Sequence, residues 1–83
     1  IKPSIILIDE IENNLRYLIE EQNEKDLTLR VHPYVHAYLT KGILSRKVKW
    51  ILRFKTRISV YPSFSYHFLE YRFFNKIDDE IKL

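Results

Sequence analysis

The sequence predicts an α+β domain: an N-terminal amphipathic helix, a strand, two short helices and an antiparallel strand pair. The helices are expected on one face of a small, mainly antiparallel sheet. Two patterns carry this prediction, because apolar residues recur with helical spacing at the start of the chain and alternate with polar residues in later stretches. With 83 residues, of which 46% are hydrophobic, the chain suffices for a single small domain with a thin core.

The first predicted element is a helix over residues 4–22, with Ser4 as its N-terminal cap. Its apolar positions follow the helical period and define one stripe to be buried: Ile8, Ile11, Leu15, Leu18 and Ile19. A strand is expected next, over Leu27–Val31, because apolar and polar side chains alternate there.

Two short helices are predicted after this strand. Pro33 ends the strand and suits the first turn of a helix, which we expect over residues 34–40. Gly42, the only glycine, is the expected stop of that helix. Ser45 is a good cap for a second helix over Arg46–Phe54.

The last predicted elements are the two strands of an antiparallel pair. A short strand begins at Ile58, and a long strand runs over residues 66–74. Alternation in the long strand predicts that Leu69, Tyr71 and Phe73 share an apolar face, which packs against the first helix.

Charge is divided unevenly along the chain. Residues 1–26 hold seven acids and three cations, whereas residues 27–76 hold one acid and ten cations, which is a net charge of +9. Aromatic residues are interleaved in this basic block: Tyr38, Trp50, Phe54 and Tyr61. Such a composition is typical of a surface that binds phosphates and stacks on bases. A solvated helix face is the alternative interpretation.

The predicted helix over Arg46–Phe54 concentrates cations on one side. At about 100° per residue, Arg46, Lys49 and Arg53 fall within an arc of ~60°. Together with neighbouring cations they make up six candidate RNA-binding residues: Lys41, Arg46, Lys49, Arg53, Lys55 and Arg57. Trp50 borders the arc, and two placements stay open for it: burial in the core, or partial exposure beside the cations.

Residue types for catalysis and metal binding are sparse. His32, His36 and His67 lack the regular spacing of metal ligands, and the acidic residues 78–80 are expected in a solvated turn. The chain has no cysteine for a thiolate site. We therefore expect no catalytic residue, metal or cofactor in this segment. The longest apolar run, over residues 5–8, is too short to cross a bilayer, which favours a cytoplasmic protein without a membrane partner.

Three segments of the chain are distinctive. Residues 9–42 read DEIENNLRYLIEEQNEKDLTLRVHPYVHAYLTKG, Lys49 precedes Trp50, and residues 65–75 read SYHFLEYRFFN. Together they resemble the extreme C-terminal segment of bacterial ribonuclease E/G family proteins, in the version found in Bacteroidetes-type bacteria. The resemblance covers most of the chain. The absence of methionine, even at the first position, likewise favours a segment of a longer chain.

The resemblance implies that the chain is the small C-terminal domain of an RNA-processing endoribonuclease. Its role in that family is mainly assembly of the oligomer that shapes the RNA-binding surface. The catalytic subdomain with magnesium-binding aspartates and the zinc-linking cysteines precede this segment in the family. Magnesium and zinc are therefore implied for the parent chain alone. The predicted helix over Arg46–Phe54 carries more positive charge than an assembly role requires.

Two classes of function follow from these observations. In the first, apolar surface on the helix over residues 4–22 or the strand over residues 66–74 binds a second copy of the chain, or the catalytic domain of the parent. In the second, the basic face binds RNA weakly and without sequence preference. A stand-alone KH-like single-stranded RNA-binding module is the alternative, because strand–helix–helix–strand is the minimal KH order. Residues 40–43, however, supply one glycine of the GxxG loop.

Overall fold

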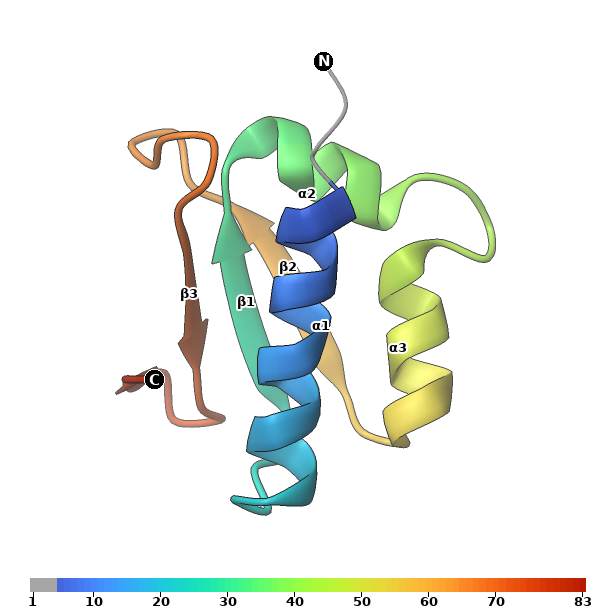
Figure 1. Cartoon of the computed structure of the whole chain (residues 1–83), viewed down its shortest axis with the longest axis vertical. Coiled ribbons are helices and arrows are strands. Elements are labelled where there is room, and N and C mark those ends of the chain that lie inside the picture. The colour runs from blue at the N-terminus through green and yellow to red at the C-terminus, as the bar shows by residue number, and fades with distance from the viewer. Residues whose placement is uncertain (1–4) are drawn as a thin grey trace.

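The computed structural model describes residues 5–83, which form a layer of helices on one face of a four-stranded sheet (Figure 1). In chain order the elements are α1 (Ile5–Glu20), β1 (Leu27–Val31), α2 (Pro33–Thr40), α3 (Arg46–Phe54), β2 (Ile58–Pro62), β3 (Tyr71–Phe74) and β4 (Glu80–Ile81). The predicted α+β class is confirmed. The predicted cap at Ser4 lies outside the described residues.

β1 lies inside the sheet, whose strand order is β2-β1-β3-β4. It pairs in parallel with β2 and antiparallel with β3, which in turn pairs antiparallel with β4. A parallel pair needs a long crossover, and α2 and α3 supply it. β2 and β3, which the sequence suggested as a pair, run in opposite directions but are separated by β1.

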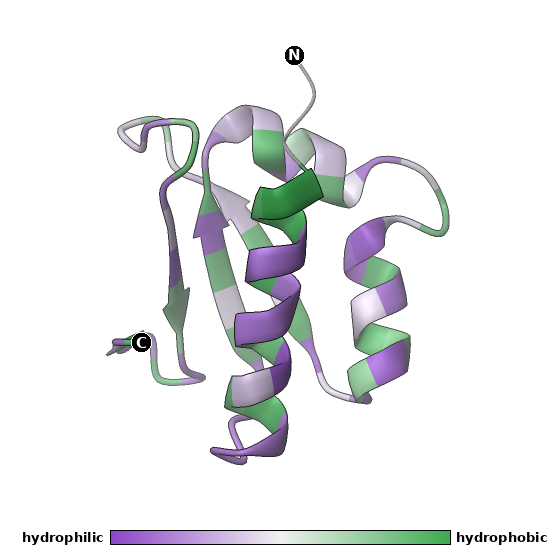
Figure 2. Ribbon diagram, viewed as in Figure 1, coloured by the Kyte–Doolittle hydropathy of each residue, from purple (hydrophilic) through white to green (hydrophobic). Residues whose placement is uncertain are grey.

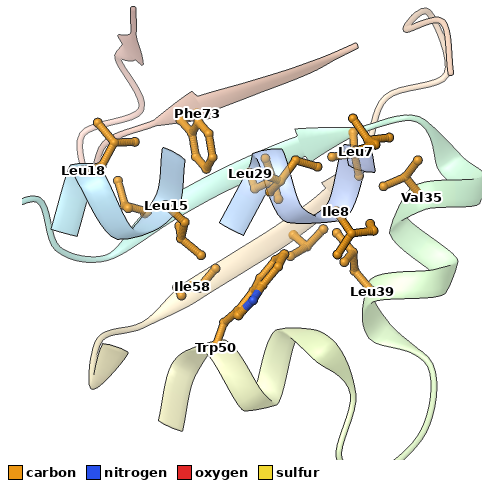
Figure 3. Close-up of a cluster of buried hydrophobic side chains, with 14 residues drawn as sticks. Leu7, Ile8, Leu15, Leu18, Leu29, Val35, Leu39, Trp50, Ile58 and Phe73 are labelled. Atoms are coloured by element: carbon orange, nitrogen blue, oxygen red, sulfur yellow. The ribbon is translucent and has the colours of Figure 1, made fainter. Parts of the chain in front are cut away.

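One hydrophobic core fills the space between the helices and the sheet (Figure 3). Its members with at most 1% exposure include Ile11, Leu15, Leu18, Leu29, Leu39, Trp50 and Phe73. The predicted stripe of α1 is buried, except for Ile19, which is half-buried. Leu7, which was not part of the predicted stripe, is also buried. The strands contribute every second side chain to this core, so their remaining side chains point to the opposite face.

Short-range contacts explain where α3 begins and ends. The Ser45 Oγ accepts a hydrogen bond from the Val48 N–H at 3.3 Å, which is the predicted cap. Lys55 adopts the left-handed conformation with φ of 56°, and its N–H donates to the Ile51 carbonyl at 2.8 Å. The predicted bounds Arg46–Phe54 are therefore confirmed at both ends.

The predicted strand over residues 66–74 is wrong in its first half. Only Tyr71–Phe74 form β3, and the residues before them fold into turns. Phe68 packs against the core, and its ring meets that of His32 edge-on with 5.4 Å between centroids. Leu69 is instead 60% exposed. This tertiary ring contact outweighs the local alternation, which would have placed Leu69 inside and Phe68 outside.

Candidate nucleic-acid interface

Two of the three cations in the predicted α3 arc face α1, where Glu12 binds both. Arg53 Nη1 lies 2.9 Å from Glu12 Oε2, and Arg46 Nη1 lies 3.7 Å from Glu12 Oε1. The Glu12 side chain is only 18% exposed, so solvent screens these contacts less than it screens surface pairs. Glu12 therefore offsets part of the positive charge that the sequence assigned to an RNA-binding face.

Trp50 belongs to the same cluster and is 1% exposed. Its indole ring enters the core (Figure 3), and its Nε1–H donates to Glu12 Oε1 at 2.8 Å. This hydrogen bond lowers the pKa of Glu12; burial opposes the shift, whereas Arg53 and Arg46 add to it. Of the two placements left open for Trp50, burial is the correct one. Its ring is consequently not available for stacking on a base.

The other four predicted RNA-binding residues are exposed: Lys41, Lys49, Lys55 and Arg57. Within residues 5–83, none of these four forms an ion pair. They follow α3 from the turn before it to the loop after it, along a helix of about 13 Å. We term these four residues the basic edge. It lies on the α3 side of the molecule, far from the β4 edge of the sheet (Figure 1).

α3 also carries exposed apolar side chains. Val48 and Leu52 on the helix and Leu44 in the turn before it recur at every fourth position; Leu44 and Leu52 are each 65% exposed, and Val48 is half-buried. We term these three residues the α3 stripe. α1, in contrast, buries its apolar stripe, and its first turn is hydrophobic (Figure 2). Its exposed apolar side chains are Ile5 and Ile6 in that turn and Tyr17 near its other end.

Arg30 is a functional candidate that sequence reasoning missed. It belongs to β1, and its guanidinium carbon lies 5.7 Å from the ring centroid of Tyr61 and 5.5 Å from that of Phe74. These residues come from three strands and point away from the helices, because the alternate residues of those strands are in the core. Alternation in Leu27–Val31 already placed Arg30 on the polar face. The strand order was needed to find the rings beside it.

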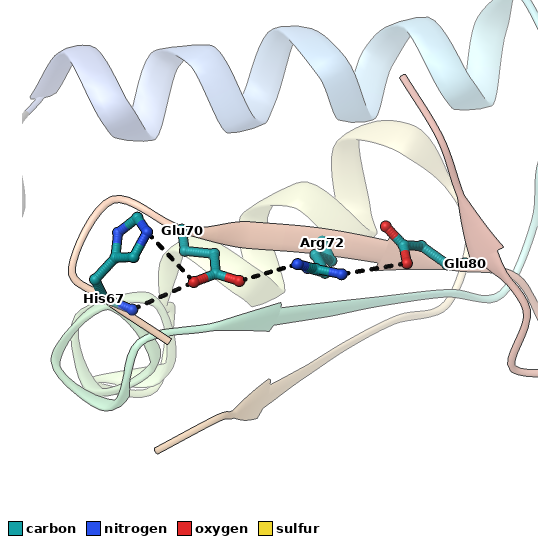
Figure 4. A network of polar contacts seen from close by, with 4 residues as sticks. All are labelled: His67, Glu70, Arg72 and Glu80. Atoms are coloured by element: carbon teal, nitrogen blue, oxygen red, sulfur yellow. Dashed lines mark hydrogen bonds and ion pairs between the residues drawn. The ribbon is translucent and has the colours of Figure 1, made fainter. Parts of the chain in front are cut away.

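A network of charges surrounds Arg72, the cross-strand partner of Arg30 on β3 (Figure 4). Arg72 Nη2 lies 3.3 Å from Glu70 Oε2, and its Nη1 lies 3.5 Å from Glu80 Oε1. Glu80 makes the largest contribution to raising the pKa of Arg72. His67 Nε2 lies 3.5 Å from Glu70 Oε1 at the other end of the network. The charge of Arg72 is thus compensated within the chain.

His32 and His67 have separate surroundings. His32 accepts a hydrogen bond through Nδ1 from the Tyr34 N–H at 3.1 Å and caps α2, whereas His67 contacts Glu70. No group of three or more His, Cys, Asp or Glu side chains is placed to hold a metal ion within residues 5–83. In the same part of the chain, no helix combines the length and the apolar character that crossing a membrane requires.

No family model, curated protein or solved structure matches this chain. The observations that bear on its function are therefore the exposed cations of the basic edge, the α3 stripe, and Arg30 between its two rings.

Proposed function

We propose that this domain holds RNA weakly and without sequence preference through the basic edge. In this proposal it is the C-terminal, non-catalytic domain of a cytoplasmic ribonuclease E/G-type endoribonuclease. The observation that carries the RNA contact is that all four cations of the basic edge are exposed and, within residues 5–83, paired with no carboxylate. Like charges gathered in this way attract phosphates and repel one another when none is bound.

The basic edge suits phosphates better than bases. Its residues are lysines and one arginine along a helix, and the tryptophan of that helix is buried. Three to four phosphate contacts on a single strand release counterions, which lowers log affinity by about 0.7 per contact for each tenfold rise in salt. Phosphate contacts position a nucleic acid and carry no sequence information, so binding without sequence preference is expected.

The α3 stripe supports the second part of the proposal, which is assembly. Its two leucines are each 65% exposed, and the exposed Lys49 lies on the same helix as Leu52. Exposed apolar side chains that cluster beside polar ones mark a contact surface for another protein. We infer that the stripe meets a second copy of the chain or the catalytic domain of the parent ribonuclease, as the resemblance to that family implies.

Two matched variants test the RNA contact. Lys49→Glu/Lys55→Glu reverses two charges on the basic edge, and Lys76→Glu/Lys82→Glu reverses two exposed charges near the β4 edge. Both lower the net charge by the same amount. Fluorescence anisotropy with a labelled 12-nucleotide single-stranded RNA at low salt measures the affinity. We expect the first variant to bind about tenfold or more weakly, and the second to stay within about threefold of the unmodified chain.

Two outcomes would remove the RNA contact from the proposal. One is no binding by the unmodified chain at low salt. The other is an equal loss in both variants, which would mean that net charge alone governs binding. Arg46 and Arg53 are poor choices for this experiment, because their contacts with Glu12 hold α3 in place and their replacement also affects folding.

The KH-like alternative has one observation in its favour. The β1-α2-α3-β2 unit pairs its two strands in parallel, and the turn between the helices is exposed, with Gly42 at φ of 84°. Gly42 is, however, the single glycine of this turn, and Ser45, three residues after it, caps α3. Photo-crosslinking discriminates the two: a KH-like clamp places crosslinks at residues 42–45, whereas the basic edge places them beside Lys49 and Lys55.

A further inference from the structure

The face of the sheet opposite the helices carries two cross-strand rows of side chains. One row contains Ser59, Thr28, Phe74 and Glu80. The second row contains Tyr61, Arg30 and Arg72. We term this surface the open sheet face, because α1, α2 and α3 all contribute to the core on the opposite side. Arg30 lies at its centre, on the strand that pairs with both β2 and β3.

Arg30 is a charge on this face that lacks a carboxylate partner within residues 5–83. It lies directly opposite Arg72, and like charges in that position repel each other. Glu70 and Glu80 offset the charge of Arg72, whereas Arg30 forms no ion pair with any carboxylate of residues 5–83. The two carboxylates stay with Arg72, so the guanidinium of Arg30 is free to pair with an anionic group of a ligand.

The rings beside Arg30 point to the nature of that ligand. Tyr61 is 50% exposed at the β2 edge, and Phe74 is partly exposed on β3. The two rings hold the Arg30 guanidinium by cation–π contacts at 5.7 and 5.5 Å. A guanidinium fixed in this way presents a flat stacking surface as well as donors for a phosphate. Aromatic faces, a planar cation and one unpaired positive charge match a nucleotide.

We propose that the open sheet face is a second RNA site, which takes unstacked bases of a single strand on Tyr61, Phe74 and the Arg30 guanidinium. A backbone phosphate next to those bases accepts hydrogen bonds from Arg30. The residues of this site are separate from the basic edge, although the site rests on the proposed function in that its ligand is RNA. Because every base has a π-face, the site does not select a sequence. Open four-stranded sheets of other folds bind single-stranded RNA through aromatic side chains in the same manner.

A comparison of two ligands of equal charge tests this site. One is a labelled oligouridine of 12 nucleotides, and the other is a 12-mer with the same ribose–phosphate backbone but no bases. Stacking on two side chains predicts that the unmodified chain binds the oligouridine about tenfold or more tightly than the abasic strand. Tyr61→Leu and Phe74→Leu keep apolar bulk and should each reduce that ratio about fivefold. Arg30→Gln should weaken binding of both strands.

Tyr17→Leu is the matched control, because Tyr17 is similarly exposed at 47% but lies on α1, on the other side of the sheet. It should leave the ratio unchanged, and the emission of the buried Trp50 reports whether each variant is folded. Equal affinity for both strands, with steep salt dependence, would overturn the stacking site and leave the basic edge intact. A preference that survives in Tyr61→Leu and Phe74→Leu would also overturn it. No binding of either strand at low salt would remove both proposals.

Discussion

Glu12 links α1 to α3 through polar contacts. Its carboxylate accepts hydrogen bonds from Trp50 at 2.8 Å and from Arg53 at 2.9 Å, and it forms a longer ion pair with Arg46 at 3.7 Å. All of these contacts favour the ionised carboxylate, whose side chain is mostly buried. Loss of its charge should therefore loosen the packing of α3 on the core.

Glu12→Gln tests this role. Gln can still accept one hydrogen bond but loses the charge, so we expect the free energy of unfolding to fall by about 1–2 kcal/mol. Urea unfolding followed by Trp50 fluorescence measures it. Glu20→Gln is the control, because Glu20 is exposed at the end of the same helix, and it should cost less than about 0.5 kcal/mol. Equal effects in the two variants would contradict the role of Glu12.

The same residue makes stability depend on acidity. In the folded chain, the pKa of Glu12 lies below its ordinary value of 4.5. As the pH falls through 4.5, the unfolded chain therefore takes up a proton before the folded chain does. The stabilisation by Glu12 is complete above pH 4.5 and is lost as the pH falls through the lowered pKa. The difference in stability between the unmodified chain and Glu12→Gln should accordingly shrink as the pH falls below 4.5 and through the lowered pKa of Glu12. A difference that stays constant would refute this assignment.

Tyr71 has the corresponding effect at high pH. The pKa of Tyr71 is raised from 10.0 to about 12. Burial is the largest cause, and the hydrogen bond that the Tyr71 hydroxyl donates to Glu10 at 2.5 Å is the next. Asn14 Nδ2 donates to the same hydroxyl at 2.7 Å and partly opposes the shift. The neutral phenol is therefore favoured in the folded chain. Its contribution to stability is complete below pH 10 and is lost as the pH rises to about 12.

Tyr71→Phe should remove both hydrogen bonds and this alkaline dependence together. We expect a loss of about 1 kcal/mol at neutral pH and a flatter decline of stability from pH 10 to about 12. Urea unfolding at a series of pH values gives both quantities. If Tyr71→Phe lost stability as steeply as the unmodified chain over that interval, another group would have to be responsible.

At the scale of elements, the turn before β3 differs most from the pattern in the sequence. Phe68 packs against the core there, and Leu69 is 60% exposed. Phe68→Ala should therefore cost about 2–3 kcal/mol, and Leu69→Ala less than about 0.5 kcal/mol. A strand over residues 66–74 with Leu69 inside would give the reverse order. Thermal unfolding of the two variants decides between the two arrangements.

The elements that the sequence predicts well have local signals. β1 follows from strict alternation, and α3 follows from the Ser45 cap and its helical period. The pairing of cations depends on distant residues, since Glu12 and Arg53 are 41 positions apart. The rings beside Arg30 likewise depend on strand order, which periodicity does not specify. Local patterns therefore could not tell that Glu12 pairs with Arg46 and Arg53, whereas the other four candidate cations form no ion pair within residues 5–83.

At the scale of the whole molecule, the helix layer and the open sheet face present different surfaces. The basic edge and the α3 stripe lie on the helix layer, whereas Arg30 and its rings lie on the sheet.

The α3 stripe predicts self-association at high micromolar concentration, because its leucines lose contact with water on pairing. Light scattering should report a species larger than the monomer, and Leu44→Asp/Leu52→Asp should return it to a monomer. A monomeric unmodified chain would remove the support for self-association.

The salt dependence of RNA binding tests most directly whether the basic edge contacts the phosphate backbone. For a labelled 12-nucleotide single-stranded RNA between about 25 and 200 mM salt, three to four contacts predict that a plot of log affinity against log salt has a slope of about −2 to −3. Lys49→Glu/Lys55→Glu should make this slope shallower by about 1.4, since it removes two contacts. A slope near zero for the unmodified chain, or an unchanged slope for the variant, would contradict the account.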